Sequence, residues 1–186
     1  MESRKKHETV ALRTATPADA AGIRAIYAPY VRETAVTFEY EVPTEEEFAH
    51  RISHTLERYP YIVAHTDKKK IVGYAYASEY YARAAYSRSV EVSIYVEAGL
   101  HGLGIGRKLY QRLETELRTR GFLNLTACIA WSDSLGKYLT RQSPLFHSRM
   151  GYTQCAHFHQ IGYKFGQWFD IIWMEKMLGE HKEKAQ

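Results

Sequence analysis

The stretch SVEVSIYVEAGLHGLGIGRKLYQRLETELRTRG, residues 89–121, predicts a strand, a glycine-rich turn and a helix in succession. Apolar residues alternate with polar ones from Val90 to Val96, which is the period of a strand with one apolar and one polar face. Glycine then stands at every second position from Gly102 to Gly106. From Ile105 to Leu117 apolar residues recur at helical spacing, and Gly121 stands where this helix should end.

The glycine-rich turn has the chemistry of an anion site. Glycine allows a sharp bend and a close approach of backbone N–H groups to a ligand. The first N–H groups of a helix have no internal acceptor, and the helix dipole favours negative charge there. Arg107 and Lys108 add positive charge, so a pyrophosphate group would fit. The alternative is a flexible connection without a ligand, and glycine spacing alone does not separate the two.

The strand before the turn carries Glu91 on its polar face. A parallel strand of a dinucleotide-binding fold is usually apolar on both faces, so this pattern disfavours an NAD-binding protein. A carboxylate a few residues before an anion site offers a proton acceptor beside a phosphate-bearing cofactor. The alternative is that Glu91 pairs with a nearby cation, such as Arg83 or Arg88, and only supports the structure.

HGLGIG at 101–106, after a strand ending in IYV, resembles the coenzyme A pyrophosphate loop of the GNAT superfamily of N-acyltransferases, [QR]-x-x-G-x-[GA]. His101 replaces the usual Gln or Arg. Within that superfamily the chain is most similar to the phosphinothricin and methionine sulfoximine N-acetyltransferases, through its S-x-x-x-H-x-x-x-G-[YF] and G-x-K-x-G-x-W-x-D patterns. The matching segments are VTFEYE (36–41), GYAYASEYYARAAY (73–86), SVEVSIYV (89–96), SPLFHSRMGY (143–152) and GYKFGQWFD (162–170).

The resemblance implies an α+β (α/β) fold with a mixed, mostly antiparallel sheet of about seven strands flanked by helices. We expect this single GNAT domain over residues 9–178, with the polar segments 1–8 and 179–186 disordered. A length of 186 residues is ordinary for one domain. The family commonly forms homodimers, so the resemblance also implies a dimer.

The implied activity is transfer of an acetyl group from acetyl-CoA to the α-amine of a small amino acid or analogue, such as phosphinothricin, methionine sulfoximine or methionine sulfone. Glu91 matches the family's base-like glutamate and His147 its histidine; the alternative for His147 is a structural histidine. A backbone N–H near Tyr95 or Val96, freed by a bulge that the resemblance implies, should bind the thioester oxygen.

The resemblance also implies the residues that contact each substrate. Arg83 suits a substrate carboxylate, because a guanidinium can bind one bidentately, and Tyr86 could support it. Ordinary aromatic packing is the alternative for Phe38 and Tyr81. Coenzyme A contacts are expected at Ile94, Tyr95, Val96, Gly102, Leu103, Gly104, Ile105, Gly106 and Arg107. Amino-acid contacts are expected at Phe38, Tyr81, Ala82, Arg83, Tyr86, Val92 and Ser93.

Two other functions stay open at this point. Acetylation of a peptide or protein amine is the first, and a non-catalytic acyl-CoA-binding module is the second, against which Glu91 argues. The segment 131–142 is longer than usual for the family and has Thr140 near the place of an asparagine. This departure puts the substrate in doubt more than the reaction.

Composition excludes several classes of function. The net charge of +4, from 25 Lys and Arg against 21 Asp and Glu, is too small and dispersed for nucleic-acid binding. Without a membrane-length apolar run or a signal peptide, we expect a cytoplasmic protein with no membrane partner. Cys128 lies in an apolar run and is expected to be a core thiol. No metal is expected, because His157 and His159 alternate on a strand without a third ligand nearby.

The rest of the chain predicts a conventional set of elements. Helices are expected from Thr16-Pro17 to about Arg32 and from Thr44, with a capping box to Glu47, to about Arg58. Ser143 should cap a short helix, after a partial helical turn around 135–139. Strands are expected at Thr9–Arg13, Tyr61–His65, Ile71–Ser78, Leu123–Ala130, Tyr152–Gln160 and Phe169–Met177, the last two joined by 162–167.

Overall fold

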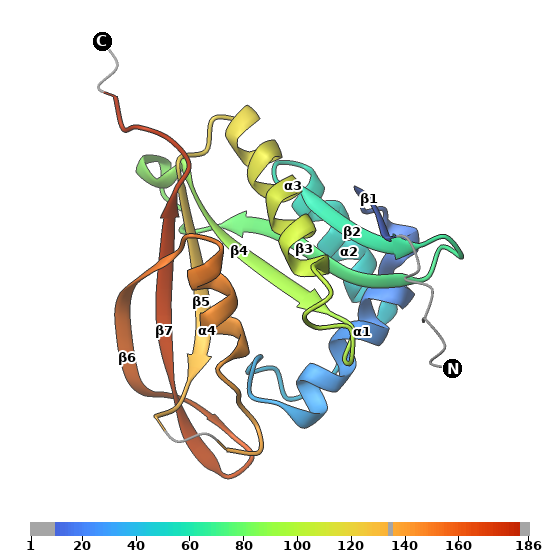
Figure 1. Cartoon of the computed structure of the whole chain (residues 1–186), viewed down its shortest axis with the longest axis vertical. Helices are drawn as coiled ribbons and strands as arrows, with labels where there is room; N and C mark the ends of the chain where they lie inside the picture. The colour runs from blue at the N-terminus through green and yellow to red at the C-terminus, as the bar shows by residue number, and fades with distance from the viewer. Residues whose placement is uncertain (1–9, 134–135, 183–186) are drawn as a thin grey trace, which may run out of the picture.

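The computed structural model of the chain describes residues 10–133 and 136–182. A seven-stranded sheet runs in the order β1-β2-β3-β4-β5-β7-β6, and only the β4–β5 pair is parallel. Helices cover both faces of this sheet (Figure 1), which confirms the predicted fold class. The strands are β1 (Val10–Thr14), β2 (Tyr61–Thr66), β3 (Ile71–Glu79), β4 (Ser89–Val96), β5 (Asn124–Trp131), β6 (Thr153–Lys164) and β7 (Gln167–Met177). The helices are α1 (Ala20–Glu33), α2 (Glu45–Leu56), α3 (Ile105–Thr119) and α4 (Gln142–Arg149), with 3-10 turns at Pro17–Asp19 and Ala84–Tyr86.

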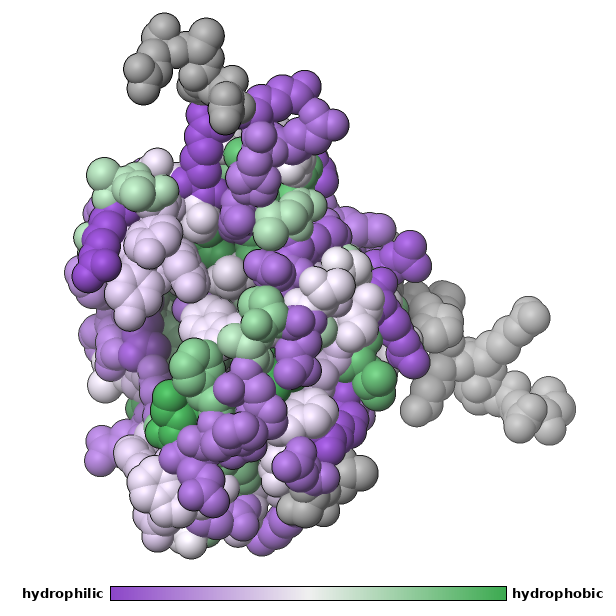
Figure 2. All heavy atoms as spheres, turned by 90° about the vertical axis from the view of Figure 1, so that its left-hand side faces the viewer, coloured by the Kyte–Doolittle hydropathy of each residue, from purple (hydrophilic) through white to green (hydrophobic). Residues whose placement is uncertain are grey.

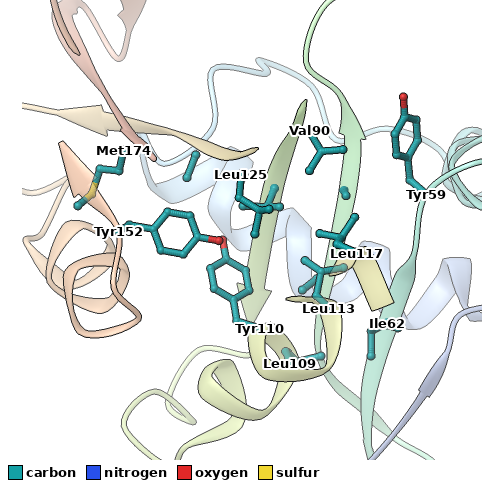
Figure 3. Close-up of a cluster of buried hydrophobic side chains, with 14 of the residues drawn as sticks. Tyr59, Ile62, Val90, Leu109, Tyr110, Leu113, Leu117, Leu125, Tyr152 and Met174 are labelled. Atoms are coloured by element: carbon teal, nitrogen blue, oxygen red, sulfur yellow. The ribbon is translucent and has the colours of Figure 1, made fainter. Parts of the chain in front are cut away.

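The apolar stripe of α3 is the centre of the larger core. Its residues at every fourth position, from Ile105 to Leu117, are at most 5% exposed. They pack toward Val90 of β4 and Leu125 of β5 (Figure 3). Full burial of each such side chain contributes about 1.5–3 kcal/mol to stability. This packing fixes α3 on one face of the sheet and places its N-terminus just beyond the end of β4.

Helices α1 and α2 cover the opposite face over β2, β3 and β4. The second core cluster lies there and includes Ile23, Ile52 and Tyr74. Thr44 begins α2 as predicted, because its Oγ1 accepts a hydrogen bond from the Glu47 N–H at 3.1 Å. The Glu47 carboxylate pairs with Arg51 rather than with the Thr44 N–H that the predicted capping box requires.

Strands β4 and β5 pair only at one end. Their register joins Ser89–Glu91 with Asn124–Thr126, and beyond it the two strands diverge (Figure 1). The β3–β4 register runs without a shift from Gly73 opposite Val96 to Glu79 opposite Val90. The expected bulge in β4 is therefore absent from this register. Strand β5 diverges from β4 because it stays paired with β7 along its whole length.

The β6–β7 hairpin is longer than predicted. Most of the expected connection 162–167 is strand, and only Phe165–Gly166 links β6 to β7. Both residues have positive φ, 51° and 75°, as in the tight hairpin turn whose twist matches that of the strands. Phe165 gives no sign of this in the sequence, because residues other than glycine rarely adopt positive φ.

A second correction concerns the histidines of β6. Asp170 of β7 lies beside both His157 and His159, so the expectation that no third ligand is near them is wrong. A register shift between Phe158 and Gly162 brings this about. Strand register is a long-range property, and the spacing of residues along one strand does not reveal it.

The segment before α4 also differs from prediction. Residue 135 of the expected helical turn lies outside the described residues, and Gly136 forms an isolated bridge with Leu139 rather than a helix. Arg141 stands at the N-cap of α4, so Ser143 lies within the helix and does not cap it.

The predicted disordered ends lie mostly outside the described residues, as 1–8 and 183–186 do. Within the described part of the tail, His181 contacts the Asn124 side chain at 2.6 Å. Over residues 10–133 and 136–182, none of the helices combines the length and the apolar character that crossing a membrane requires.

Candidate active site

The glycine-rich turn presents unpaired donors at the start of α3. Gly102 and Gly104 have φ of 82° and 80°, and Gly104 is the N-cap. The first helix-starting bond is from the Lys108 N–H to the Gly104 carbonyl, at 3.1 Å. Within the described residues, the N–H groups of positions 105–107 therefore have no acceptor. With the exposed Arg107 and Lys108 beside them, these donors form the geometry of an anion site.

Gly106 serves packing rather than the turn. A Cβ on Gly106 would lie 3.1 Å from the Phe146 ring and 3.4 Å from the Ile94 side chain. Its small size thus lets α3 approach α4 and β4 closely. Leu103 is 54% exposed on the turn, whereas Ile105 is buried and offers only its backbone to a ligand. The residues expected to bind coenzyme A are therefore brought together where β4 ends and α3 begins.

The splayed side of β4 carries the backbone donors next to this turn. The Glu97 N–H bonds to the Val72 carbonyl of β3 at 2.9 Å. Since successive N–H groups of a strand point to opposite sides, those of Ile94 and Val96 point away from β3, and that of Tyr95 points toward it. Alternation thus favours Val96 over Tyr95 as the donor to a thioester oxygen.

Tyr30 of α1 connects this edge to the turn. Its hydroxyl donates to the Val96 carbonyl at 2.6 Å and lies 3.0 Å from His101 Nε2. His101, which replaces the usual Gln or Arg, is therefore linked to the end of β4 through Tyr30. No local pattern predicts this contact, because Tyr30 and His101 are 71 positions apart in the chain.

Glu91 lies on the sheet face opposite α3, half-buried and without a charge partner. Within the described residues, no ion pair or hydrogen bond to its carboxylate is present, and neither Arg83 nor Arg88 pairs with it. Burial raises the pKa of the Glu91 carboxyl above its ordinary value. The structural alternative, in which Glu91 pairs with a cation, loses its support, and a carboxylate suited to accept a proton remains.

Cys128 shares the face of Glu91, and sequence reasoning missed this. Cys128 is exposed, so the expected core thiol is wrong. The alternation along β5 explains the error, because Leu125, Ala127 and Ile129 face the core while Cys128 faces the other way. Partial burial and the charge of Glu91 raise the pKa of this thiol to about 12, which keeps it protonated and poorly nucleophilic at neutral pH.

An aromatic cluster stands over this face. Trp173 of β7 lies opposite Cys128. The Tyr80 ring packs edge-on against the Trp173 ring, with 5.9 Å between the ring centroids. Tyr81 and Tyr86 in turn contact Tyr80, at 5.7 and 5.6 Å. The loop between β3 and β4 carries four of the predicted amino-acid contacts, and all four are exposed: Tyr81, Ala82, Arg83 and Tyr86.

The two predicted amino-acid contacts on β4, Val92 and Ser93, lie on opposite faces of the sheet. Ser93 pairs with Tyr76 on the face of Glu91. Val92 is 3% exposed and packs in the core on the α3 side. Any contact of Val92 with an amino acid would therefore be through its backbone, as strand alternation requires.

Phe38 is held on the Glu91 face by β6. Its ring occupies the space beside Gly162, where an added Cβ would lie 2.3 Å from the ring. It also packs at 6.3 Å from Phe169, which faces the same side of β7 as Trp173. The buried Lys164 Nζ donates to the carbonyls of Thr34 and Thr37, at 2.9 and 2.7 Å. Thus Gly162 and Lys164 of the G-x-K pattern fix the loop that carries Phe38.

His147 faces the interior on the other side of the sheet. It is 3% exposed, its Nδ1–H donates to the Ser143 carbonyl at 2.8 Å, and its Nε2 is 2.8 Å from the Tyr110 hydroxyl. In the neutral ring Nε2 must then accept from Tyr110. Burial lowers the pKa of His147 to about 4, so the ring is neutral at physiological pH. These contacts favour a positioning role, and the catalytic role stays a prediction.

Comparison with known proteins fixes the family. The model of the acetyltransferase (GNAT) domain matches residues 12–173. The chain belongs to the GNAT acetyltransferase family. This confirms the resemblance inferred from the glycine-rich turn and identifies the protein as an N-acetyltransferase.

Two specific named activities are found among the relatives of this GNAT acetyltransferase. It is 33% identical over 172 residues to a phosphinothricin N-acetyltransferase of Streptomyces coelicolor, which covers 91% of this chain and 96% of the relative. It is 32% identical over 171 residues to an L-methionine sulfoximine/L-methionine sulfone acetyltransferase of Salmonella typhimurium, over 91% and 95% of the two chains. The crystal structure of a phosphinothricin acetyltransferase from Sinorhizobium meliloti in complex with AcCoA matches with a TM-score of 0.85 and 33% identity, over 95% and 94%.

Proposed function

We propose that this GNAT acetyltransferase transfers the acetyl group of acetyl-CoA to the α-amine of a small amino acid or analogue of the phosphinothricin or methionine sulfoximine type. The observation that carries the proposal is the Glu91 carboxylate, which has no ion pair or hydrogen bond within residues 10–133 and 136–182 and lies on the strand that leads into the donor-rich turn at 102–107. A carboxylate of raised pKa and an anion cradle on one strand–turn–helix unit are what acetyl transfer to an amine requires.

The chemistry follows from this arrangement. An α-amine is mostly protonated at neutral pH and must lose a proton before its nitrogen attacks. Glu91 accepts that proton, directly or through a water molecule. Attack on the thioester carbonyl places negative charge on its oxygen, and the N–H groups on the splayed side of β4 are directed to stabilise it. The C–S bond then breaks, the attacking nitrogen gives up its extra proton to become a neutral amide, and coenzyme A leaves as a thiolate that takes up that proton.

The names of the relatives and one exposed cation support the substrate class. Both named activities act on small amino-acid analogues. Arg83 is exposed and makes no ion pair within the described residues, so its guanidinium is available to a substrate carboxylate. Tyr81 and Tyr86 lie on the same loop, with their ring centroids 6.1 Å apart.

The decisive experiment measures thiol release from acetyl-CoA with a panel of amines. The panel contains phosphinothricin, methionine sulfoximine, methionine sulfone, ordinary amino acids and short peptides. We expect turnover with at least one free amino acid or analogue and little with peptides. Turnover only with peptides would replace the proposed substrate class, and cofactor binding without any thiol release would refute the enzymatic proposal.

Substitution of Gly162 by Ala tests the predicted contact of Phe38 with the amino-acid substrate. The backbone of Gly162 does not have positive φ, so alanine is allowed there, but its Cβ would overlap the Phe38 ring. We expect a higher KM for the amino acid, by about tenfold, with the KM for acetyl-CoA little changed. Gly136→Ala is the matched control, because a Cβ at Gly136 meets no atom of the described part of the chain within 4 Å. Equal effects of both substitutions, or a change only toward acetyl-CoA, would contradict the assignment.

A homodimer is part of the proposal. Several large hydrophobic side chains of the β6–β7 hairpin are exposed, including Phe158, Ile161, Tyr163 and Trp168. Figure 2 looks onto the β6 side of the molecule and shows hydrophobic residues at the surface among polar ones. Such patches on soluble proteins often mark interfaces. Sedimentation equilibrium should give twice the chain mass of 21.5 kDa. A cytoplasmic location remains a prediction from the sequence.

A further inference from the structure

We propose that His157, His159 and Asp170 form a binding site for a divalent transition-metal ion of the Zn²⁺ type. Their potential ligand atoms all lie within 4.8 Å of one another. Asp170 Oδ2 is 2.8 Å from His157 Nε2 and 3.3 Å from His159 Nδ1. This site is separate from the residues proposed for acetyl transfer.

The backbone at the bulge of β6 holds the three ligands together. His157 and His159 lie on β6, and the register shift between Phe158 and Gly162 begins there. Gln160 adopts a φ of 47° and donates its N–H to Asp170 Oδ1 at 2.7 Å. One carboxylate oxygen is thereby fixed by the main chain, and the other, Oδ2, is left facing both imidazoles.

The distances suit a metal ion. Nitrogen and oxygen ligands bind Zn²⁺ at about 2.0–2.2 Å, so ligand atoms around a tetrahedral ion are about 3.3 Å apart. The 3.3 Å from Asp170 Oδ2 to His159 Nδ1 meets this value, and the 2.8 Å to His157 Nε2 is shorter, so a small rotation of the His157 ring would admit an ion. Two imidazoles and a carboxylate suit Zn²⁺, Co²⁺ and Ni²⁺ better than Mg²⁺ or Ca²⁺, which prefer oxygen ligands. Three protein ligands leave one position of the tetrahedron for water.

The surroundings provide both support and access. The Gln160 N–H orients the carboxylate, and the Trp131 ring packs edge-on against His157 at 6.4 Å. Such contacts to the ligands are what hold metal sites in shape. The Asp170 side chain is 14% exposed and that of His159 is 73% exposed. An ion can therefore enter from solvent on the side of His159.

A plain ion pair is the competing interpretation. A single ion pair accounts for one imidazole beside Asp170. A surface ion pair contributes little to stability, however, and does not require a second imidazole. Here both imidazoles direct a nitrogen at the same oxygen, while the other oxygen is engaged by the backbone. The three ligand atoms are thereby gathered within 4.8 Å, close enough for one metal ion to bind all of them.

The test is a titration of untagged, metal-stripped protein with ZnCl₂ in an isothermal calorimeter. We expect one ion per chain and a rise in Tm when Zn²⁺ exceeds its Kd. His159→Ala and Asp170→Asn should each weaken binding by at least about tenfold. His159 is exposed, so its substitution keeps the test valid if the Asp170 variant fails to fold. Co²⁺ bound at the site should give visible absorption bands that both variants lose.

Two control variants replace other potential zinc ligands, the histidine pair of α2 and the Cys155 thiol. His50 and His54 stack on α2 at 6.3 Å and have no shared carboxylate within the described residues. Cys155 is an exposed thiol on the same strand as the site. We expect His50→Ala/His54→Ala and Cys155→Ser to bind Zn²⁺ as wild type does. Absence of binding, binding unchanged in His159→Ala, or binding lost in either control would overturn the proposal.

Discussion

Glu91→Gln is expected to lower kcat for amino-acid acetylation by about 10²- to 10⁴-fold, the usual contribution of a positioned general base. Glutamine keeps the shape of the side chain but cannot accept the proton of the amine. No ion pair to Glu91 is broken by the change among the described residues, so we expect the fold and the KM for acetyl-CoA to be retained.

The pH dependence should carry the same signature. Burial raises the pKa of Glu91, and only the ionised form, present above that pKa, can act as a base. The kcat/KM of the wild type should therefore fall as the pH is lowered through the raised pKa, above the ordinary value of about 4.3. Ionisation of the amine substrate affects both proteins alike, so the ratio of wild-type to Glu91→Gln rates isolates this acid limb.

Glu175→Gln is the matched control for this prediction. Glu175 lies on the same sheet face and pairs with Thr126, which in turn pairs with Glu91. It is a carboxylate on β7, two strands away from β4, with no role in the proposed reaction. We expect near wild-type rates and an unchanged pH profile. Full activity of Glu91→Gln, or an equal loss in both variants, would remove Glu91 from the reaction.

Gly104→Val should raise the KM for acetyl-CoA by about tenfold or more. Gly104 has a φ of 80°, and a residue with a Cβ pays about 1–2 kcal/mol for this conformation, which is about tenfold in an equilibrium constant. A Cβ there meets no atom of the described residues within 4 Å and would extend into open space at the turn that we propose binds the pyrophosphate. Steady-state kinetics with varied acetyl-CoA measure the effect.

Gly99→Val separates strain from ligand contact. Gly99 has a φ of 84°, and its Cβ position is equally open, but it precedes the turn that caps α3. The valine there should cost similar stability, measured by Tm, while leaving the KM for acetyl-CoA near the wild-type value. A KM that rises equally in both variants would show that backbone strain, and not the anion site, accounts for the loss.

The sequence by itself determined the unit at the centre of the fold. The alternation along β4, the glycines at 102–106 and the stripe of α3 are local patterns, and local patterns report local structure. They placed Glu91 on the polar face of β4, away from α3, and put donor N–H groups at the start of α3. No tertiary information was needed, because each of these features depends on residues within one turn or strand.

Only the tertiary structure decided which distant residues meet. Asp170 reaches the β6 histidines through a shifted register, and Phe38 lies over Gly162 although more than a hundred residues separate them. His147 faces Tyr110 in the core rather than an open site. The splay of β4 from β5 likewise needs no bulge. The physical reason is that strand register and helix facing are set by long-range packing, which the period of a single segment does not encode.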